Sequence, residues 1–513
     1  MLKKFVFIGF CFFVWAALAA GVIFLGWQKI VPGGKKSFIQ DFKADNYFLG
    51  KLSPAERAVA GDGGGAKIIG NPVYFSLKPP RQFSKVRVTL VYRVKDGCAE
   101  NETGGATGEA GKTCKNNTSR SLPIIEAGIL TDRFWHYSLK PLKNTIISEL
   151  EKKWYAVENQ GITLLQRKKK FSGLNDFLAN PPATKEIAVY NYDFAPGFKL
   201  SDYAAQKNIS VLPAKLRGKY EFFVYLKNEN LELSLDFLDL NKNTDSDPIK
   251  ITITGQGRTI ANEELPDDSN TSDNGLGGRP GPISFRIPGL PEGAYKVEIT
   301  ANDDIITESL KTGQLKIAFI RKVHIYEAVF PLKLITDSDG IALQTNNPAS
   351  LGKAAVGKES LDVNETYRQF EKCLSAKNTE ITLLKKDTLI SGDGIFSFSS
   401  GALFNPGVKK ITPCFNPDQS GVNYIIADYN PSKQENSLID GEASWKSASA
   451  DFNLSGAYSE KGKYSFMVSV PGLKAEDEIN DAVLIREIRV ELEGKSLWEK
   501  ANEVIKSTSQ KVK

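Results

Sequence analysis

The hydrophobic positions of the chain form two patterns, one continuous run near the start and many short alternating runs after it. The run covers Phe5–Trp27 and contains no charged residue over its 23 positions. An α-helix needs about 20 apolar residues to cross a membrane, whereas the apolar core of a cleavable signal peptide spans about 7–15. The run therefore predicts a single transmembrane anchor within residues 1–27. A signal peptide cleaved after Ala17-Leu18-Ala19 is the alternative, because this triplet has the small-x-small form of a cleavage site.

The alternating runs predict a mainly β protein. From Lys67 onward, short stretches rich in β-branched and aromatic residues end at Pro, Gly or Asn, the residues that favour turns. Residues 213–327 hold eight such runs in quick succession, and helices are expected only at 143–154, 175–180 and the C-terminus. Strands and helices do not alternate, which argues against a nucleotide-binding α/β fold. We therefore expect two to four antiparallel β-sandwiches of jelly-roll or immunoglobulin-like type, followed by a short C-terminal helix.

Changes of pattern along the chain suggest a division into six segments. In chain order they are the anchor 1–27, a glycine-rich linker 28–66, a first β-rich domain 67–212 with a short helix, a second β-sandwich 213–327 with acidic loops, a third β-rich region 328–494 made of one or two sandwiches, and a C-terminal helix 495–513.

Cysteine usage indicates the compartment. Apart from Cys11 in the apolar run, the chain has Cys98, Cys114, Cys373 and Cys414. The simplest of the three pairings is local, with one disulfide around a Gly-rich loop and one in the third region. Disulfides persist in oxidising compartments, so we expect the bulk of the chain outside the cytoplasm, at the cell surface or in a periplasm. Basic residues flank both ends of the run almost equally and do not set its orientation, and four free thiols in a cytoplasmic protein is the alternative.

Acidic loops in the second β domain predict a Ca²⁺ site. Residues 239–247 place an oxygen-bearing side chain at every second position, as loops that bind Ca²⁺ do. The loop is not an EF-hand, because Thr244 and Lys250 stand where that motif has Gly and Glu. If the strands alternate in direction, two further acidic loops emerge at the same end, and a cation would relieve the repulsion among their carboxylates. The candidate ligands are Asp239, Asn241, Asn243, Asp245, Asp247, Asp267, Asp268, Asp303 and Asp304. Ordinary exposed turns, which favour the same residue types, are the alternative.

Signals for catalysis or nucleic-acid binding are weak. The chain has two histidines and no G-x-S-x-G or H-E-x-x-H motif, so we expect no enzymatic activity. A net charge of +6 with 25% charged residues is ordinary for a globular protein and does not indicate a nucleic-acid partner. The alternative is a membrane-tethered hydrolase of cell-envelope polysaccharide that uses a pair of carboxylates.

Aromatic residues of the first β domain allow two interpretations. Trp135 and Tyr137 are two positions apart, as are Tyr190 and Tyr192, so each pair shares one face of a strand and is expected in the core. A flat platform for sugars is the alternative, and its further candidates are Trp154, Tyr155 and Trp445. Taken together, the sequence predicts a membrane-anchored structural, adhesive or binding module that contacts a surface protein or polysaccharide. A subunit of a surface assembly, joined through edge strands, is a second alternative.

Overall fold

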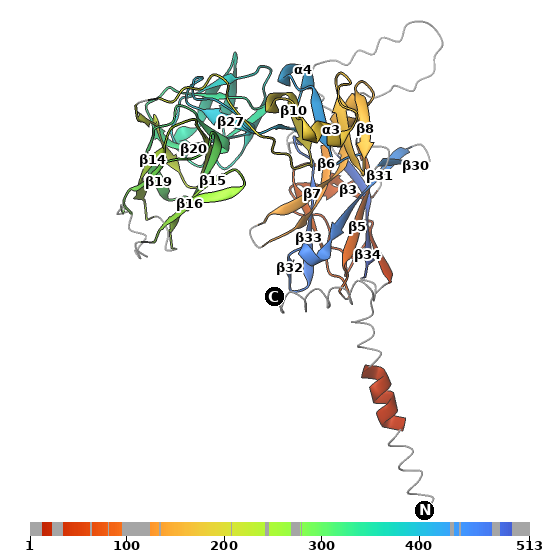
Figure 1. The fold of residues 1–513 in the computed structure, drawn as a ribbon. Coiled ribbons are helices and arrows are strands. Elements are labelled where there is room, and N and C mark those ends of the chain that lie inside the picture. The colour runs from red at the N-terminus through yellow and green to blue at the C-terminus, as the bar shows by residue number, and fades with distance from the viewer. Residues whose placement is uncertain are drawn as a thin grey trace, which may run out of the picture. The chain divides into compact units, whose positions relative to one another are not determined.

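The computed structural model describes most of the chain and divides it into two compact units (Figure 1). Unit 1 comprises Met1–Lys153 and Tyr429–Lys513, and unit 2 comprises Trp154–Asp428. The described residues are 13–22, 34–61, 64–80, 82–94, 124–132, 135–206, 208–241, 246–267, 278, 280–430, 435–440, 443–473 and 483–494. Strands predominate among them, which confirms the prediction of a mainly β protein.

Unit 1 is built from two sheets whose strands come from both ends of the chain, orange and blue in Figure 1. The first sheet has the order β2-β3-β34-β5-β31-β30, with β1 also paired to β34. Its strands are β1 Lys35–Gln40, β2 Ala58–Ala60, β3 Ala66–Ile68, β5 Lys85–Val94, β30 Glu435–Asp440, β31 Ala443–Asn453 and β34 Val483–Glu493. The second sheet has the order β32-β33-β6-β7, with β4 on β33. Its strands are β4 Val73–Leu77, β6 Ile124–Leu130, β7 Tyr137–Asn144, β32 Ser459–Glu460 and β33 Lys463–Ser469.

One hydrophobic core joins the two sheets of unit 1, and strand periodicity explains it. In β5 and β34 the apolar residues alternate with polar ones and form a single buried face. The rings of Phe75 and Phe466 stack in this core with their centroids 5.1 Å apart. Arg87 on β5 and Asp451 on β31 pair across 364 residues of sequence, so the division in chain order does not describe this unit. Local periodicity does not reveal pairing between distant strands. The division predicted from the sequence therefore differs from the two units of the structure.

The first and last segments of unit 2 together form a small sheet with short helices beside it. Its order is β28-β10-β29-β9-β8. The elements are β8 Tyr155–Asn159, β9 Ile162–Gln166, α3 Leu174–Ala179, a 3₁₀ turn η1 Thr184–Glu186, β10 Ile187–Tyr190, β28 Lys409–Lys410, α4 Pro417–Ser420 and β29 Tyr424–Ala427. β10 runs parallel to both β28 and β29, unlike the purely antiparallel arrangement that we expected. Its partners lie more than 200 residues later in the chain, so no hairpin imposes an antiparallel direction.

The middle module of unit 2 is a strip of antiparallel strands that curls around one core. The pairing runs β16-β15-β18-β13-β20-β12-β19-β14-β17, with β11 also on β19. The strands are β11 Ser210–Val211, β12 Ala214–Arg217, β13 Tyr220–Leu226, β14 Leu231–Asp239, β15 Ile249–Gly255, β16 Arg258–Leu265, β17 Ile283–Ile287, β18 Gly293–Thr300, β19 Ile305–Thr312 and β20 Ile317–Ala328. All eight strands expected between 213 and 327 are present, as β13 to β20. Strict alternation in β14 places every second residue in the core.

A second module follows and shares β20 with the first. Its pairing runs β24-β23-β26-β21-β27-β22-β25, and β27 also pairs with β20. The elements are β21 Leu332–Thr336, β22 Gly340–Thr345, η2 Pro348–Ser350, β23 Gly352–Val356, β24 Glu359–Val363, β25 Phe370–Cys373, β26 Thr379–Leu383 and β27 Thr388–Ser397. A single hydrophobic cluster continues from the middle module into this one. The expected boundary at 327/328 therefore falls at the end of a strand that both modules use.

Two of the expected helices are confirmed, and the chain ends are only partly described. Segment 143–154 contains α2 Thr145–Glu151, where the Asn144 side chain caps the helix by accepting a hydrogen bond from Ile147 N. Segment 175–180 coincides with α3. The expected linker 28–66 carries β1 and β2. Of the apolar run only residues 13–22 are described, and they are helical and exposed. Within the described residues we find no helix with the length and apolar character needed to span a membrane. The expected C-terminal helix 495–513 lies outside the described residues.

Candidate metal site

The three acidic loops of the middle module emerge at one end of it, as the sequence predicts. Asp239 at the end of β14 pairs with Ile305 at the start of β19, so the β14–β15 and β18–β19 loops are neighbours. On the adjoining strands, Ile249 at the start of β15 pairs with Leu265 at the end of β16. The β16–β17 loop therefore begins at the same end. Antiparallel pairing alone brings together three loops that are distant in sequence.

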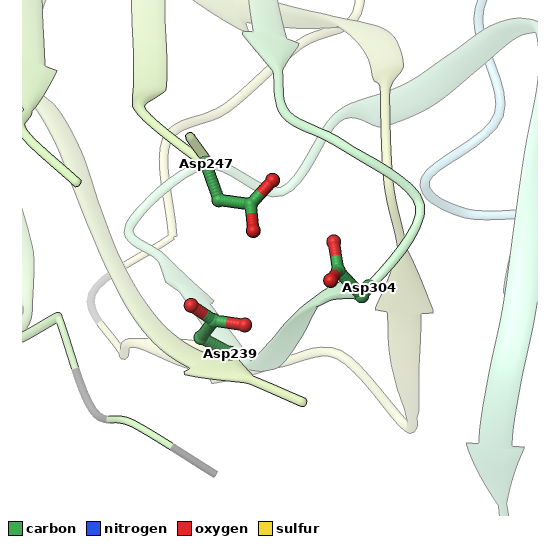
Figure 2. A group of neighbouring side chains, drawn as sticks. All are labelled: Asp239, Asp247 and Asp304. Carbon is green, nitrogen blue, oxygen red and sulfur yellow. The ribbon is translucent and has the colours of Figure 1, made fainter. Parts of the chain in front are cut away.

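Three carboxylates from these loops face one another (Figure 2). Asp239 is the last residue of β14, Asp247 precedes β15, and Asp304 precedes β19. One oxygen of each lies within 4.8 Å of the others. The exposed fractions of the three residues are 2%, 6% and 3%. We call this group the Asp239 cluster.

Amide groups position the carboxylates of the Asp239 cluster. Asn241 N donates to Asp239 Oδ1 at 2.8 Å, and Asn241 adopts φ 46°, a left-handed conformation that asparagine tolerates better than most residues. The Asn302 side chain donates to Asp247 Oδ1 and to the carbonyl of Ser246. These bonds tie the β18–β19 loop to the β14–β15 loop.

The remaining predicted ligands divide into near and distant groups. Asn241 is buried beside Asp239, and Asp267 accepts a hydrogen bond from Asp247 N at 3.0 Å. Asp303 is exposed and lies against Gly218, where an added Cβ would come within 2.9 Å of Asp303 Oδ1. Its backbone carbonyl accepts from the Arg217 guanidinium. Asn243, Asp245 and Asp268 lie outside the described residues.

The chemistry of the Asp239 cluster suits a hard cation. Bringing three carboxylates together under burial disfavours their charged forms through desolvation and mutual repulsion. A divalent cation reverses both effects, and Ca²⁺ prefers six to eight oxygen ligands from carboxylates, amide side chains, backbone carbonyls and water. Asp239, Asp247 and Asp304 would supply the charge, and Asn241 and Asp267 would supply neighbouring oxygens.

A second acidic group, which the sequence did not reveal as a site, lies in the following module. Asp337 and Asp339 precede β22, and Asp393 lies within β27. Lys409 Nζ donates to Asp339 Oδ1 at 2.8 Å and to the carbonyl of Asp337 at 2.9 Å. Burial, with a smaller contribution from the neighbouring carboxylates, raises the pKa of Asp339 to about 6 against the opposing influence of Lys409. We call these three aspartates with Lys409 the Asp339 cluster.

The segment that carries Lys409 is attached to this module in several ways. The side chains of Asn405 and Thr412 donate to the other two carboxylates of the cluster, at 2.7 and 2.8 Å. Cys373 at the end of β25 and Cys414 form a disulfide, which confirms the expected pairing in this region. Cys98 and Cys114 lie outside the described residues.

The two histidines have carboxylate partners that their sequence context does not indicate. His324 on β20 contacts Asp387 at 2.9 Å, and the same carboxylate oxygen pairs with Arg217. Burial raises the pKa of Asp387, but His324 and Arg217 outweigh it and lower the pKa overall. His136 contacts Asp132 at 2.6 Å and lies directly before β7.

Comparisons with known proteins identify no family. No protein-family model matches the chain, and no curated protein sequence matches it. Among solved structures, the chain aligns with infectious bursal disease virus Gt strain at 8% identity and a TM-score of 0.15, covering 90% of this chain and 79% of the viral chain. It also aligns with dimeric latent PorU from Porphyromonas gingivalis at 10% identity and a TM-score of 0.13, covering 66% of this chain and 34% of the other. Similarities at this level carry no argument about fold or function.

Proposed function

We propose that this chain is a membrane-anchored, extracytoplasmic β-sandwich protein that serves as a structural, adhesive or binding module at the cell surface, with Ca²⁺ bound at the Asp239 cluster. The observation that carries the Ca²⁺ proposal is the convergence of three buried carboxylates, two from the β14–β15 loop and one from the β18–β19 loop. Burying three like charges is costly, and binding a divalent cation recovers that cost.

The compartment and the anchor rest on separate support. The Cys373–Cys414 disulfide favours an oxidising environment, since cytoplasmic thiols are kept reduced. The uncharged run Phe5–Trp27 favours attachment to a membrane, because 23 apolar residues suffice to cross the hydrocarbon layer. Together they support the proposal that the two folded units lie outside the cytoplasm.

Ca²⁺ at this position would make the acidic loops of the middle module more rigid. Asp239 ends β14, Asp247 precedes β15 and Asp304 precedes β19, so one ion would link the β14–β15 loop to the β18–β19 loop. Linked loops lose freedom of movement relative to one another. A rigid end suits a module that must hold a contact at a distance from the membrane.

Thermal unfolding of the full chain, solubilised in detergent, tests the Ca²⁺ proposal. The middle module is unsuitable in isolation, because β20 pairs with β27 of the next module. An ion that binds only the folded state at 100 times its Kd adds about 2.7 kcal/mol of stability, which corresponds to a rise of about 5–10 °C in the Tm of unit 2. Calcium should produce this rise and magnesium should not. Identical curves with Ca²⁺ and with chelator would contradict the proposal.

A further inference from the structure

The outer side of the second sheet of unit 1 carries an open groove beside an exposed tryptophan. The groove has a volume of about 580 Å³, within the ~300–1,000 Å³ typical of small-molecule sites. Trp135 lines it and is 70% exposed, contrary to the expectation that this residue packs in the core. The expectation was wrong because Trp135 precedes β7, so the alternation of that strand does not govern it. We call this space the Trp135 groove.

Hydrogen bonds of the neighbouring residues restrain the backbone at Trp135. Thr131 N and Thr131 Oγ1 both donate to the carbonyl of His136, and the His136 ring contacts Asp132. Within this closed turn Trp135 adopts φ 64°, a conformation that a bulky residue rarely takes and that marks a functional constraint when the surroundings maintain it.

Tyrosines and hydroxyls extend the surface next to the tryptophan. The Tyr74 ring meets Trp135 edge to face at 6.5 Å, and Tyr137 lies 5.7 Å from Tyr74. Tyr137 shares a hydrogen bond of 3.0 Å with Ser465, which lines the groove. Trp135 therefore belongs to a group of aromatic rings that lies beside hydroxyl groups able to donate and accept hydrogen bonds.

Basic residues dominate the rim of the groove. Lys78, Lys461 and Lys463 line it together with one acidic residue, Glu460. Lys78 Nζ donates to the Tyr47 hydroxyl at 2.9 Å, which directs its ammonium group and lowers the pKa of Tyr47. Three ammonium groups against one carboxylate favour an anionic ligand.

We propose that the Trp135 groove binds an acidic oligosaccharide, a chain of pyranose rings that carry carboxylates. A pyranose has a flat face of C–H groups that packs on an aromatic ring, whose face is electron-rich. Its hydroxyls match Ser76 and Ser465, and its carboxylates match the lysines of the rim. An acidic peptide would meet the lysines equally well but has no flat apolar face to cover Trp135. The site lies in unit 1, so it does not depend on the Ca²⁺ site of unit 2.

Binding of oligosaccharides to the full chain tests the proposal. The probes are octasaccharides of hyaluronan, alginate and polygalacturonate, with neutral cellohexaose and hexaglutamate for comparison. The measurement is isothermal titration calorimetry, in a zwitterionic detergent without a sugar headgroup and in the presence of chelator. We expect at least one acidic octasaccharide to bind and to bind more tightly than cellohexaose and hexaglutamate. Chelator removes Ca²⁺, so binding here reports on the groove even if the Ca²⁺ proposal fails.

Variants locate the binding site. Trp135→Ala should weaken binding about tenfold or more, as expected for loss of a central aromatic contact. The double variant Lys461→Glu and Lys463→Glu should also weaken it, because the rim then repels carboxylates. The matched controls change exposed residues of unit 2 in the same manner, Tyr367→Ala for the aromatic ring and Lys168→Glu with Lys169→Glu for the charges. Both controls should bind as the unaltered chain does.

Three results would overturn the proposal. The first is that no acidic octasaccharide binds. The second is that Trp135→Ala binds as tightly as the unaltered chain. The third is that hexaglutamate or cellohexaose binds as tightly as the acidic sugars, which would identify an acidic-peptide site or a neutral-glycan site instead.

Discussion

The two acidic clusters of unit 2 contain three aspartates each but differ in the groups that contact them. In the Asp339 cluster, the ammonium group of Lys409 lies 2.8 Å from a carboxylate and is itself 16% exposed. In the Asp239 cluster, the contacts to Asp239 and Asp247 described above come from amide groups, which donate hydrogen bonds but carry no net charge. In these contacts, an ammonium group meets the carboxylates of the Asp339 cluster, whereas uncharged amide groups meet Asp239 and Asp247.

The difference shows that acidic turns alone do not identify a metal site. The Asp339 cluster carries its own cation on a segment held by a disulfide, so its balance of charge is part of the fold. Under the Ca²⁺ proposal, a bound ion would neutralise the Asp239 cluster, and the stability of the cluster would then depend on the surrounding solution. The predictions below test this contrast, in order of decreasing effect.

Replacing Lys409 with Met should have the largest effect. The change leaves Asp339 buried without its ammonium partner, and breaking such a pair typically costs about 3–5 kcal/mol. Calorimetry of the full chain should show a clear fall in the Tm of unit 2. Lys409→Arg, which keeps the charge, is the control and should lose much less. A Lys409→Met variant with the same Tm as the unaltered chain would show that the lysine does not offset the negative charge of the Asp339 cluster.

Removing the disulfide should rank second. Cys373 and Cys414 are 41 residues apart in sequence, and a bond that closes such a loop contributes about 2–4 kcal/mol. The double variant Cys373→Ser and Cys414→Ser should lower the Tm of unit 2, and added Ca²⁺ should not restore the loss. Cys11→Ser is the control, because it changes a cysteine outside unit 2. Full recovery with Ca²⁺ would remove the contrast between the two clusters.

Replacing Asp304 with Asn should abolish the response to Ca²⁺. The unaltered chain should gain about 2.7 kcal/mol when free Ca²⁺ is 100 times its Kd, and the variant should gain almost nothing. In chelator the variant should melt no lower than the unaltered chain, since one of three crowded charges is gone. Asp339→Asn is the matched control and should keep the full Ca²⁺ response. Loss of the response in both variants would indicate a general effect of charge instead of a site.

The sequence predicted most of the secondary structure and part of the candidate site. Strand periodicity located β13 to β20, and strict alternation of direction placed the loops of Asp239, Asp267 and Asp304 at one end. It could not tell which side chains point inward. Asp304 is buried whereas Asp303 beside it is exposed. Which of the two points inward depends on the residue at which β19 starts, Ile305, and the sequence does not define that start to a single residue.

The sequence did not predict the long-range partners. Lys409 lies 70 residues after Asp339, and nothing in the local pattern of either links them. The pairing of β5 with β31 and β34 was not predicted for the same reason, because strand order depends on contacts between segments that are distant in sequence. Asp337-Ser338-Asp339-Gly340 has the composition of an acidic turn and could have been noticed, but only the structure distinguishes it from the Ca²⁺ candidate.

Replacing Asp339 with Asn should have the smallest of these effects, and it concerns the pH dependence of the free energy of unfolding. The pKa of Asp339 is about 6 in the folded chain and about 3.8 as its ordinary value, so the folded state holds a proton that the unfolded state has released between these values. The folded state binds more protons in this window, so the contribution of Asp339 to stability is full below about pH 3.8, falls between pH 3.8 and 6, and is lost above pH 6. From pH 5 to pH 7 this contribution falls by about 1 kcal/mol.

That loss should disappear in Asp339→Asn, because the amide does not titrate. The measurement is the free energy of unfolding of unit 2 at pH 5 and pH 7, and the control is Asp418→Asn, whose side chain is 78% exposed. The control should keep the slope of the unaltered chain. An unchanged slope in Asp339→Asn would show that Lys409 holds Asp339 ionised throughout, and the Asp339 cluster would then be an ion pair that pH does not affect in this range.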